Sequence, residues 1–102
     1  MASREDFQKR LEEFIGSKNV YFQPPESFKI NYPCIIYELD FVRIHRADNK
    51  AYNQQFRYAV TYVSAKPRLD MVTRFAEEFE LCAFDRAFKA DGLYHYIFNI
   101  YY

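Results

Sequence analysis

Glycine is scarce in this chain of 102 residues, which contains only Gly16 and Gly92. A phosphate-binding loop needs several glycines at fixed spacing, because the backbone must come close to the phosphate oxygens. Neither glycine lies in such a pattern. The sequence therefore argues against nucleotide-dependent catalysis.

Cysteine and histidine are as scarce as glycine, and Cys34, Cys82, His45 and His95 each stand alone. A zinc site needs four ligands, which commonly occur as pairs at short spacing. We therefore expect no metal site and no cofactor. Both cysteines lie in apolar, strand-like runs, and nothing before them resembles a signal peptide. They predict two small buried thiols in a protein made in a reducing cytoplasm.

Long hydrophobic runs and blocks of like charge are also missing. The longest apolar run is far shorter than the roughly 20 residues of a membrane span, so we expect no membrane association. The 14 basic and 14 acidic residues are interspersed, with at most two basic residues in succession. Non-specific nucleic-acid binding needs clustered Lys and Arg and is disfavoured. A net charge near zero favours self-association.

Large aromatic side chains are abundant, with 10 Tyr and 11 Phe. They can supply the core of one domain spanning residues 1–102, which is an ordinary length for a single domain. Tyrosines on an exposed sheet could instead stack the bases of a single-stranded nucleic acid. The surplus aromatics fit a protein interface better, because Tyr is enriched there.

Two segments have the apolar spacing of a helix. Phe7, Leu11 and Phe14 mark one face of a helix over residues 4–15, with Ser3 as its N-cap and Gly16 as its stop. A second helix is predicted over residues 69–79 by the same periodicity.

Alternation with a period of two predicts strands over 34–44, 54–64, 81–89 and 93–102, with short extended runs at 20–22 and 28–32. In 54–64 the inward face is predicted to be Phe56, Tyr58, Val60 and Tyr62. In 34–44, Tyr37, Leu39 and Phe41 are expected to share one face, and Tyr94, Tyr96, Phe98, Ile100 and Tyr102 to share one in the last strand. Turn residues at 47–50 and at Asp91–Gly92 join consecutive strands as hairpins. The fold class is therefore α+β, a mainly antiparallel sheet with both helices on one face.

Two arrangements resemble catalytic sites. Cys82 could be a nucleophile beside His95 across a hairpin, and Glu38 and Asp40 on one strand face could act as acid and base. A hydrogen-bonded structural histidine, opposite the region of residues 85–86, and a solvated strand face explain the same residues more simply. We therefore expect no enzymatic activity.

Several stretches in a fixed order resemble a known family. They run from about residue 20 to the C-terminus and comprise Tyr32, Pro33, Cys34, Ile35, Ile36 and Tyr37; Ala47, Asp48, Asn49 and Tyr52; Tyr58, Val60 and Thr61; Phe84, Asp85, Arg86 and Phe88; and Asp91, Leu93, His95, Phe98, Ile100 and Tyr101. Together they are similar to the tail terminators of long-tailed bacteriophages, the small tail completion proteins that cap the tail tube and join it to the head.

The resemblance implies a virion structural protein without catalytic activity, assembled in the host cytoplasm as a ring of six subunits. Its implied partners are further copies of itself, the tail tube protein and a neck or head-completion protein, with DNA passing through the lumen. The segment from Lys66 to Glu80 departs from the family by its charge and helical character. A neck or head-completion protein, or a small cellular module that binds protein or nucleic acid, remains an alternative.

Six residues are candidates for a subunit or partner interface. The turn residues Asp48 and Asn49, with Tyr52, could form the tip of a projecting hairpin. The charged pair Asp85 and Arg86 interrupts an apolar run, so we expect Arg86 to pair with a carboxylate or a backbone carbonyl in this chain or the next subunit. His95 completes the set. A ring would also cover open sheet edges through head-to-tail contacts.

Overall fold

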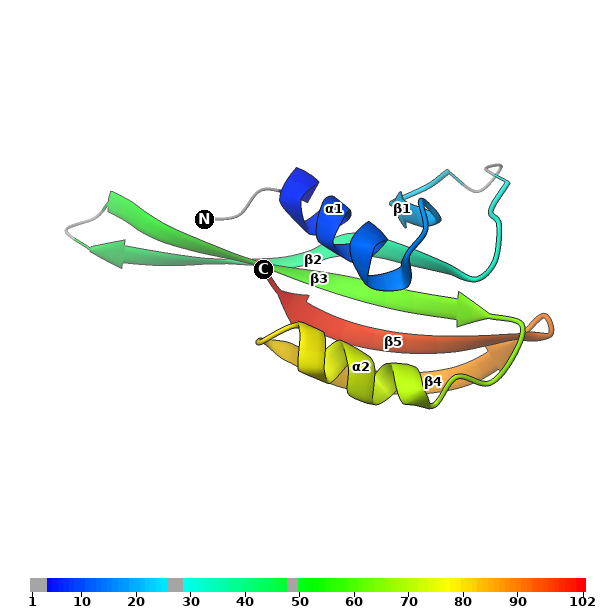
Figure 1. The fold of residues 1–102 in the computed structure, drawn as a ribbon. Coiled ribbons are helices and arrows are strands. Elements are labelled where there is room, and N and C mark those ends of the chain that lie inside the picture. The colour runs from blue at the N-terminus through cyan, green and yellow to red at the C-terminus, as the bar shows by residue number, and fades with distance from the viewer. Residues whose placement is uncertain (1–3, 26–28, 48–49) are drawn as a thin grey trace.

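Two helices and one five-stranded sheet make up the computed structural model, which describes residues 4–25, 29–47 and 50–102, with the backbone alone for residues 43, 45–47 and 50–54. The strand order in the sheet is β1-β2-β3-β5-β4 (Figure 1). The elements are α1 (Arg4–Ile15), β1 (Val20–Phe22), β2 (Cys34–Ala47), β3 (Lys50–Ser64), α2 (Asp70–Glu78), β4 (Cys82–Ala90) and β5 (Leu93–Tyr101).

The predicted α+β class is confirmed, and so are both helices and the four long strands. The first hairpin is longer than predicted, because β2 and β3 stay paired as far as Ala47 and Lys50. The short strand expected over 28–32 is wrong for its described part, since residues 29–32 form no strand. The edge of β2 that faces away from β3 already pairs with β1, from Ile35 to Tyr37. The predicted N-cap, Ser3, lies outside the described residues.

The sheet is mixed, since β1 runs parallel to β2 with Val20 opposite Ile35, while the other three pairings are antiparallel. A parallel pair needs a crossover connection. The chain between Phe22 and Cys34 provides it and returns to begin β2 beside the start of β1.

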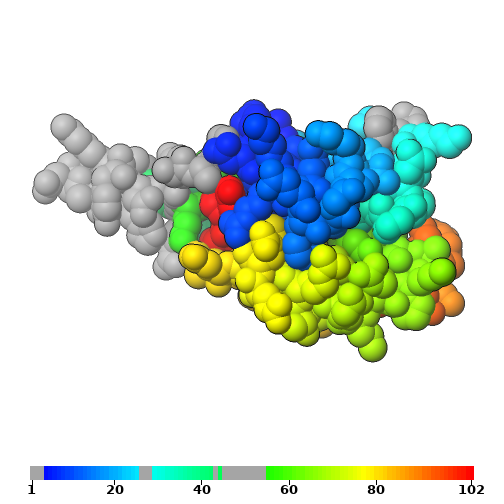
Figure 2. Space-filling model, in the orientation of Figure 1, coloured from blue at the N-terminus to red at the C-terminus, as the bar shows by residue number. Residues whose placement is uncertain are grey.

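Both helices lie on the same face of the sheet, as predicted, with α1 over β2 and β3 and α2 over β5 and β4 (Figure 1). The core forms between them and the sheet from Phe7 and Leu11 of α1, Met71 and Phe75 of α2, and the alternating buried residues of the strands. The helices also contact each other, because Phe14 packs on Phe75 with ring centroids 4.6 Å apart. Figure 2 shows this covered side, where the two helices adjoin.

The inward faces predicted for β3 and β5 are confirmed. Tyr58, Val60 and Tyr62 are buried in β3, and Phe56 packs against the same core. In β5 the buried residues are Tyr96, Phe98 and Ile100, with Tyr94 and Tyr102 partly buried beside them. The other face, called the open face below, has no helix over it (Figure 1).

The β4–β5 hairpin turns at Asp91 and Gly92, whose φ angles are 53° and 75°. Positive φ at both central residues is typical of the tight turn that matches strand twist, and it explains the Asp-Gly pair. At the end of α1, Gly16 has a φ of 67°, the left-handed conformation common after the last helical turn. Neither described helix has the length and apolar character needed to span a membrane.

Candidate functional site

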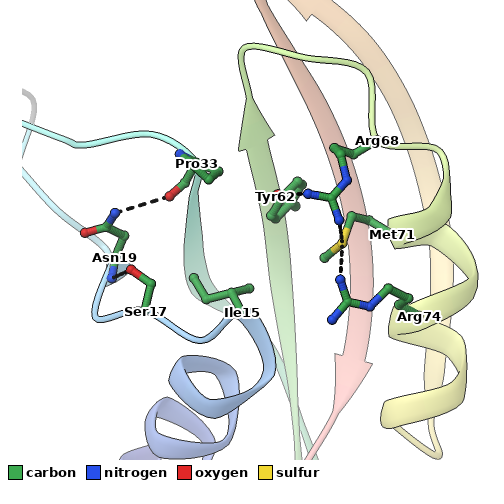
Figure 3. Close-up of a pocket in the computed structure, with 8 residues that line it drawn as sticks. All are labelled: Ile15, Ser17, Asn19, Pro33, Tyr62, Arg68, Met71 and Arg74. Carbon is green, nitrogen blue, oxygen red and sulfur yellow. Dashed lines mark hydrogen bonds between the residues drawn. The ribbon is translucent and has the colours of Figure 1, made fainter.

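One small pocket lies between the C-terminal end of α1 and the start of α2 (Figure 3). It encloses about 220 Å³, and Ile15, Ser17 and Asn19 face Arg68, Met71 and Arg74 across it. Two guanidinium groups contact the same sulfur, since Arg68 and Arg74 donate to Met71 Sδ at 3.5 and 3.4 Å.

The chemistry of this pocket does not suggest catalysis. The residues that line it include no carboxylate, histidine or cysteine. Arg68 is held by two 3.0 Å contacts to the carboxylate of Asp70, and the guanidinium lowers the pKa of that carboxyl. Within the described part of the chain, no group of three or more His, Cys, Asp or Glu side chains is arranged to hold a metal ion.

The two pairs that resemble catalytic sites in the sequence are separated or otherwise engaged. Cys82 lies opposite Ile100 on the helix-covered face, whereas His95 lies on the open face opposite Phe88. Burial raises the pKa of the Cys82 thiol to about 11, which disfavours the thiolate a nucleophile needs. Asp40 forms an ion pair with Arg57 at 2.8 Å.

The side chains of the three candidate residues in the first hairpin are not described. Asp48 and Asn49 lie outside the described residues, and Tyr52 belongs to β3 by its backbone alone. The hairpin itself does extend beyond the sheet, as expected. The strand β5 pairs with β3 only from Arg57 to Ser64, so the outer part of the hairpin consists of two strands (Figure 1).

Asp85 and Arg86 lie at an irregularity in β4, where the register with β5 shifts between Phe84 and Arg86. Both side chains are exposed. Arg86 lies opposite Ile97, and none of the ion pairs among the described residues involves it. Pairing of Arg86 with a carboxylate is thus not seen among the described residues, and its pairing with a backbone carbonyl or with the next subunit stays a prediction.

His95 is opposite Phe88 rather than residues 85–86, because the turn at Asp91 and Gly92 sets Ala90 opposite Leu93 and the pairing runs unbroken from there to Arg86. Its ring stacks on Phe88 with centroids 4.7 Å apart and planes 6° apart. Its Nδ1 lies 3.1 Å from the carbonyl oxygen of Leu93. These contacts fit a structural histidine on the open face.

Exposed apolar side chains, which the sequence reasoning missed, gather on two strands. On β2 they are Leu39, Phe41, Val42 and Ile44; on or next to β4 they are Leu81, Phe84 and Phe88. We expected the surplus tyrosines at a protein interface, yet Tyr32 is the one large exposed tyrosine among the described residues. Most described tyrosines pack into or against the core, and some bond through the hydroxyl, as Tyr37 does to Gln8 Oε1 and Tyr96 does to the N–H of Arg68.

A β-bulge explains why Phe41 is exposed. The register between β2 and β3 shifts between Leu39 and Phe41, so Phe41 lies opposite Arg57 on the open face. Arg57 lies over the Phe41 ring at 5.2 Å. Our prediction that Tyr37, Leu39 and Phe41 share one face is therefore wrong for Phe41, because the extra residue at Asp40 reverses the alternation.

Both edges of the sheet are open over long stretches. At one edge β4 has β5 as its only neighbouring strand among the described residues, and Ala83 to Lys89 are all exposed. At the other edge β1 pairs with β2 only from Ile35 to Tyr37, which leaves β2 uncovered from Leu39 to Ala47. An open edge presents unpaired backbone N–H and C=O groups to another strand.

Comparison with known proteins adds no relative. The sequence matches no family model, and no curated protein matches it significantly. The features that bear on function are therefore the two open edges, the exposed apolar residues on them, and the resemblance carried by the sequence.

Proposed function

We propose that this protein is a tail terminator of a long-tailed bacteriophage, a structural protein that closes the tail tube as a ring and joins it to the head. The observation that carries the proposal is the pair of open sheet edges, each bearing exposed apolar side chains. A subunit with two different edges that each bind another strand can assemble head to tail. Such contacts close into a ring when the rotation between neighbouring subunits divides a full turn. Six subunits is the number that the sequence resemblance implies.

The long hairpin supports a role at a junction between two assemblies. Its outer part leaves the sheet, so it can reach a partner without disturbing the core (Figure 1). Loops held by a rigid scaffold commonly carry recognition residues. Asn49 and Tyr52 near its end remain our candidates for contact with the tail tube or the neck.

Charge balance suits a channel through which DNA passes. The open face carries Glu38, the Asp40–Arg57 ion pair and Arg86. Dense Lys and Arg contacts would retain DNA in a salt-dependent way. A ring with this face toward its axis would line the lumen without a strong basic field.

An order-of-addition experiment tests the proposal. An infection in which this gene is interrupted supplies filled heads and tails, and purified protein is incubated with one of them before the excess is removed and the other is added. We expect infectious particles only when the protein is first given to the tails. Restoration only after incubation with heads would identify a neck or head-completion protein instead, and joining without the protein would refute both.

A further inference from the structure

The outward backbone groups of β4 can be identified from its pairing with β5. The N–H of Tyr101 donates to the carbonyl oxygen of Leu81, and the hairpin closes with Ala90 opposite Leu93. In an antiparallel pair the residues alternate between facing the partner strand and facing away. Beyond the bulge, Arg86 and Phe88 therefore bond toward β5, while Ala87 and Lys89 present their N–H and C=O groups to the open side.

The outward groups of β2 follow in the same way. The N–H of Ile35 donates to the oxygen of Asn19, and the oxygen of Tyr37 accepts from Gln23, so these residues face away from β3. The next outward N–H, that of Leu39, donates to the side-chain oxygen of Gln23 at 3.3 Å. Past the bulge, Phe41 faces β3, and Val42 and Ile44 face outward, with no strand of the described ranges beside them.

These two edges match in strand direction. Each of the pairs β2–β3, β3–β5 and β5–β4 is antiparallel, so β4 runs opposite to β2 within one subunit. A neighbour placed beside β4 in the same orientation would offer its β2 in antiparallel sense. Head-to-tail addition thus extends the sheet with the commoner and more stable kind of pairing.

The edges also match in length, and they match in side chains at two neighbouring positions. The uncovered stretch from Leu39 to Ala47 is as long as β4. Laid antiparallel along their full lengths, they place Ala87 opposite Val42 and Phe88 opposite Phe41. Phe88 and Phe41 both lie on the open face and are 42% and 47% exposed, so the pairing would bury two aromatic rings against each other.

We propose that β4 of one subunit pairs antiparallel with the uncovered part of β2 in the next subunit, with Ala87 opposite Val42 and Phe88 against Phe41. This inference rests on the proposed ring and specifies the interface that closes it. The alternative partner for the open edge of β4 is β4 of a second copy related by a two-fold axis. That arrangement would give a closed dimer instead of a ring.

Paired cysteines test the interface. In a Cys82→Ala background, Val42→Cys and Ala87→Cys are introduced singly and together, and protein bound to tail tubes is oxidised. Residues opposite each other in such a pair lie about 5.5 Å apart between Cα atoms, within the span of a disulfide. We expect a ladder of covalent multimers, up to the whole ring, from the double variant alone. A covalent dimer from Ala87→Cys by itself would establish the two-fold arrangement and overturn the proposal.

A proline variant tests the same edge without cysteine. Ala87→Pro removes an N–H that β5 does not use, and proline is tolerated at such edge positions. The matched control, Ala87→Thr, keeps the N–H. We expect equal melting temperatures and at least a tenfold loss of tube capping for the proline variant alone. If both variants cap tubes equally and the double cysteine variant does not cross-link, the strand pairing is wrong while the tail-terminator function stands. If the unmodified protein never caps tubes, the proposed function fails first.

Discussion

Phe7 of α1 stacks on Tyr58 of β3, with ring centroids 4.7 Å apart and planes 28° apart. Both side chains belong to the buried core. This contact fixes the N-terminal helix over the central strand, so the helix-covered face depends on it. The open face keeps more of its exposure because both helices and the main core cluster lie on the other side (Figure 1).

The loss of stability on truncating a side chain of the central strand β3 should therefore depend on the face to which that side chain belongs. Tyr58→Ala or Val60→Ala should each lower the free energy of unfolding by on the order of 1 to 4 kcal/mol, through lost burial and a cavity. Urea denaturation of each variant measures the change. Thr61→Ala, on the open face, is the control and should cost less than about 1 kcal/mol. Equal losses at Tyr58 and Thr61 would reverse the assignment of faces.

The hydroxyl of Tyr37 should link stability to alkaline pH. Burial raises the pKa of Tyr37 above its ordinary value, and its hydroxyl donates to Gln8 Oε1. The folded protein therefore holds this proton more tightly than the unfolded chain, and stability falls as the pH rises above about 10. Tyr37→Phe should be less stable at pH 7 by about 0.5 to 1.5 kcal/mol, with a shallower loss above pH 10.

Denaturation of both proteins at pH 7, 9, 10 and 11 checks this linkage. Tyr58, whose pKa is also raised by burial, provides a second source of alkaline destabilisation that both proteins share. Parallel curves for the two proteins across the whole range would show that Tyr37 does not contribute.

The two thiols should differ in reactivity. Burial raises the pKa of Cys34 to about 12 and that of Cys82 to about 11. Cys34 is fully buried, whereas Cys82, which we had expected to be buried, is partly exposed at the beginning of β4. A thiol reagent at pH 8 should modify both slowly and Cys82 first, and both should react rapidly in urea. Rapid modification of Cys34 in the folded protein would contradict its position in the sheet.

Arg86 should matter for assembly and not for folding. It is exposed and is absent from the ion pairs of the described residues. Arg86→Ala should change the free energy of unfolding by no more than about 0.5 kcal/mol and should weaken tube capping. Lys66→Ala, at an exposed residue outside both edge strands, is the charge-matched control. Capping that is unaltered in Arg86→Ala would show that the side chain is simply solvated.

Much of the fold was predictable because its periodic patterns are unbroken. The alternation through β3 and β5 assigned their buried faces correctly, and the spacing of Phe7 and Leu11 located α1. The failure in β2 has a local cause, since one inserted residue at Asp40 moves Phe41 to the other face. The direction of β1 could not be predicted, because a strand of three residues carries no signal of its partner's direction.

The candidate surfaces were less predictable for a different reason. Exposure at a sheet edge depends on strand order, and the sequence does not show that β5 lies between β3 and β4. Without the strand order, the sequence gives no sign that Phe84 and Phe88 lie on an edge strand.

Electron microscopy of tail-tube ends is the most direct test of the central claim, that this protein acts as a ring on the tube. Purified protein is mixed with tubes assembled from the tail tube protein of the same phage, and end-on and side views are compared with those of untreated tubes. We predict one closed ring, of six subunits, on one end of each tube, and capped tubes that then join heads. Tubes that remain uncapped and unable to join heads in the presence of excess protein would contradict the assignment, whatever the isolated protein forms in solution.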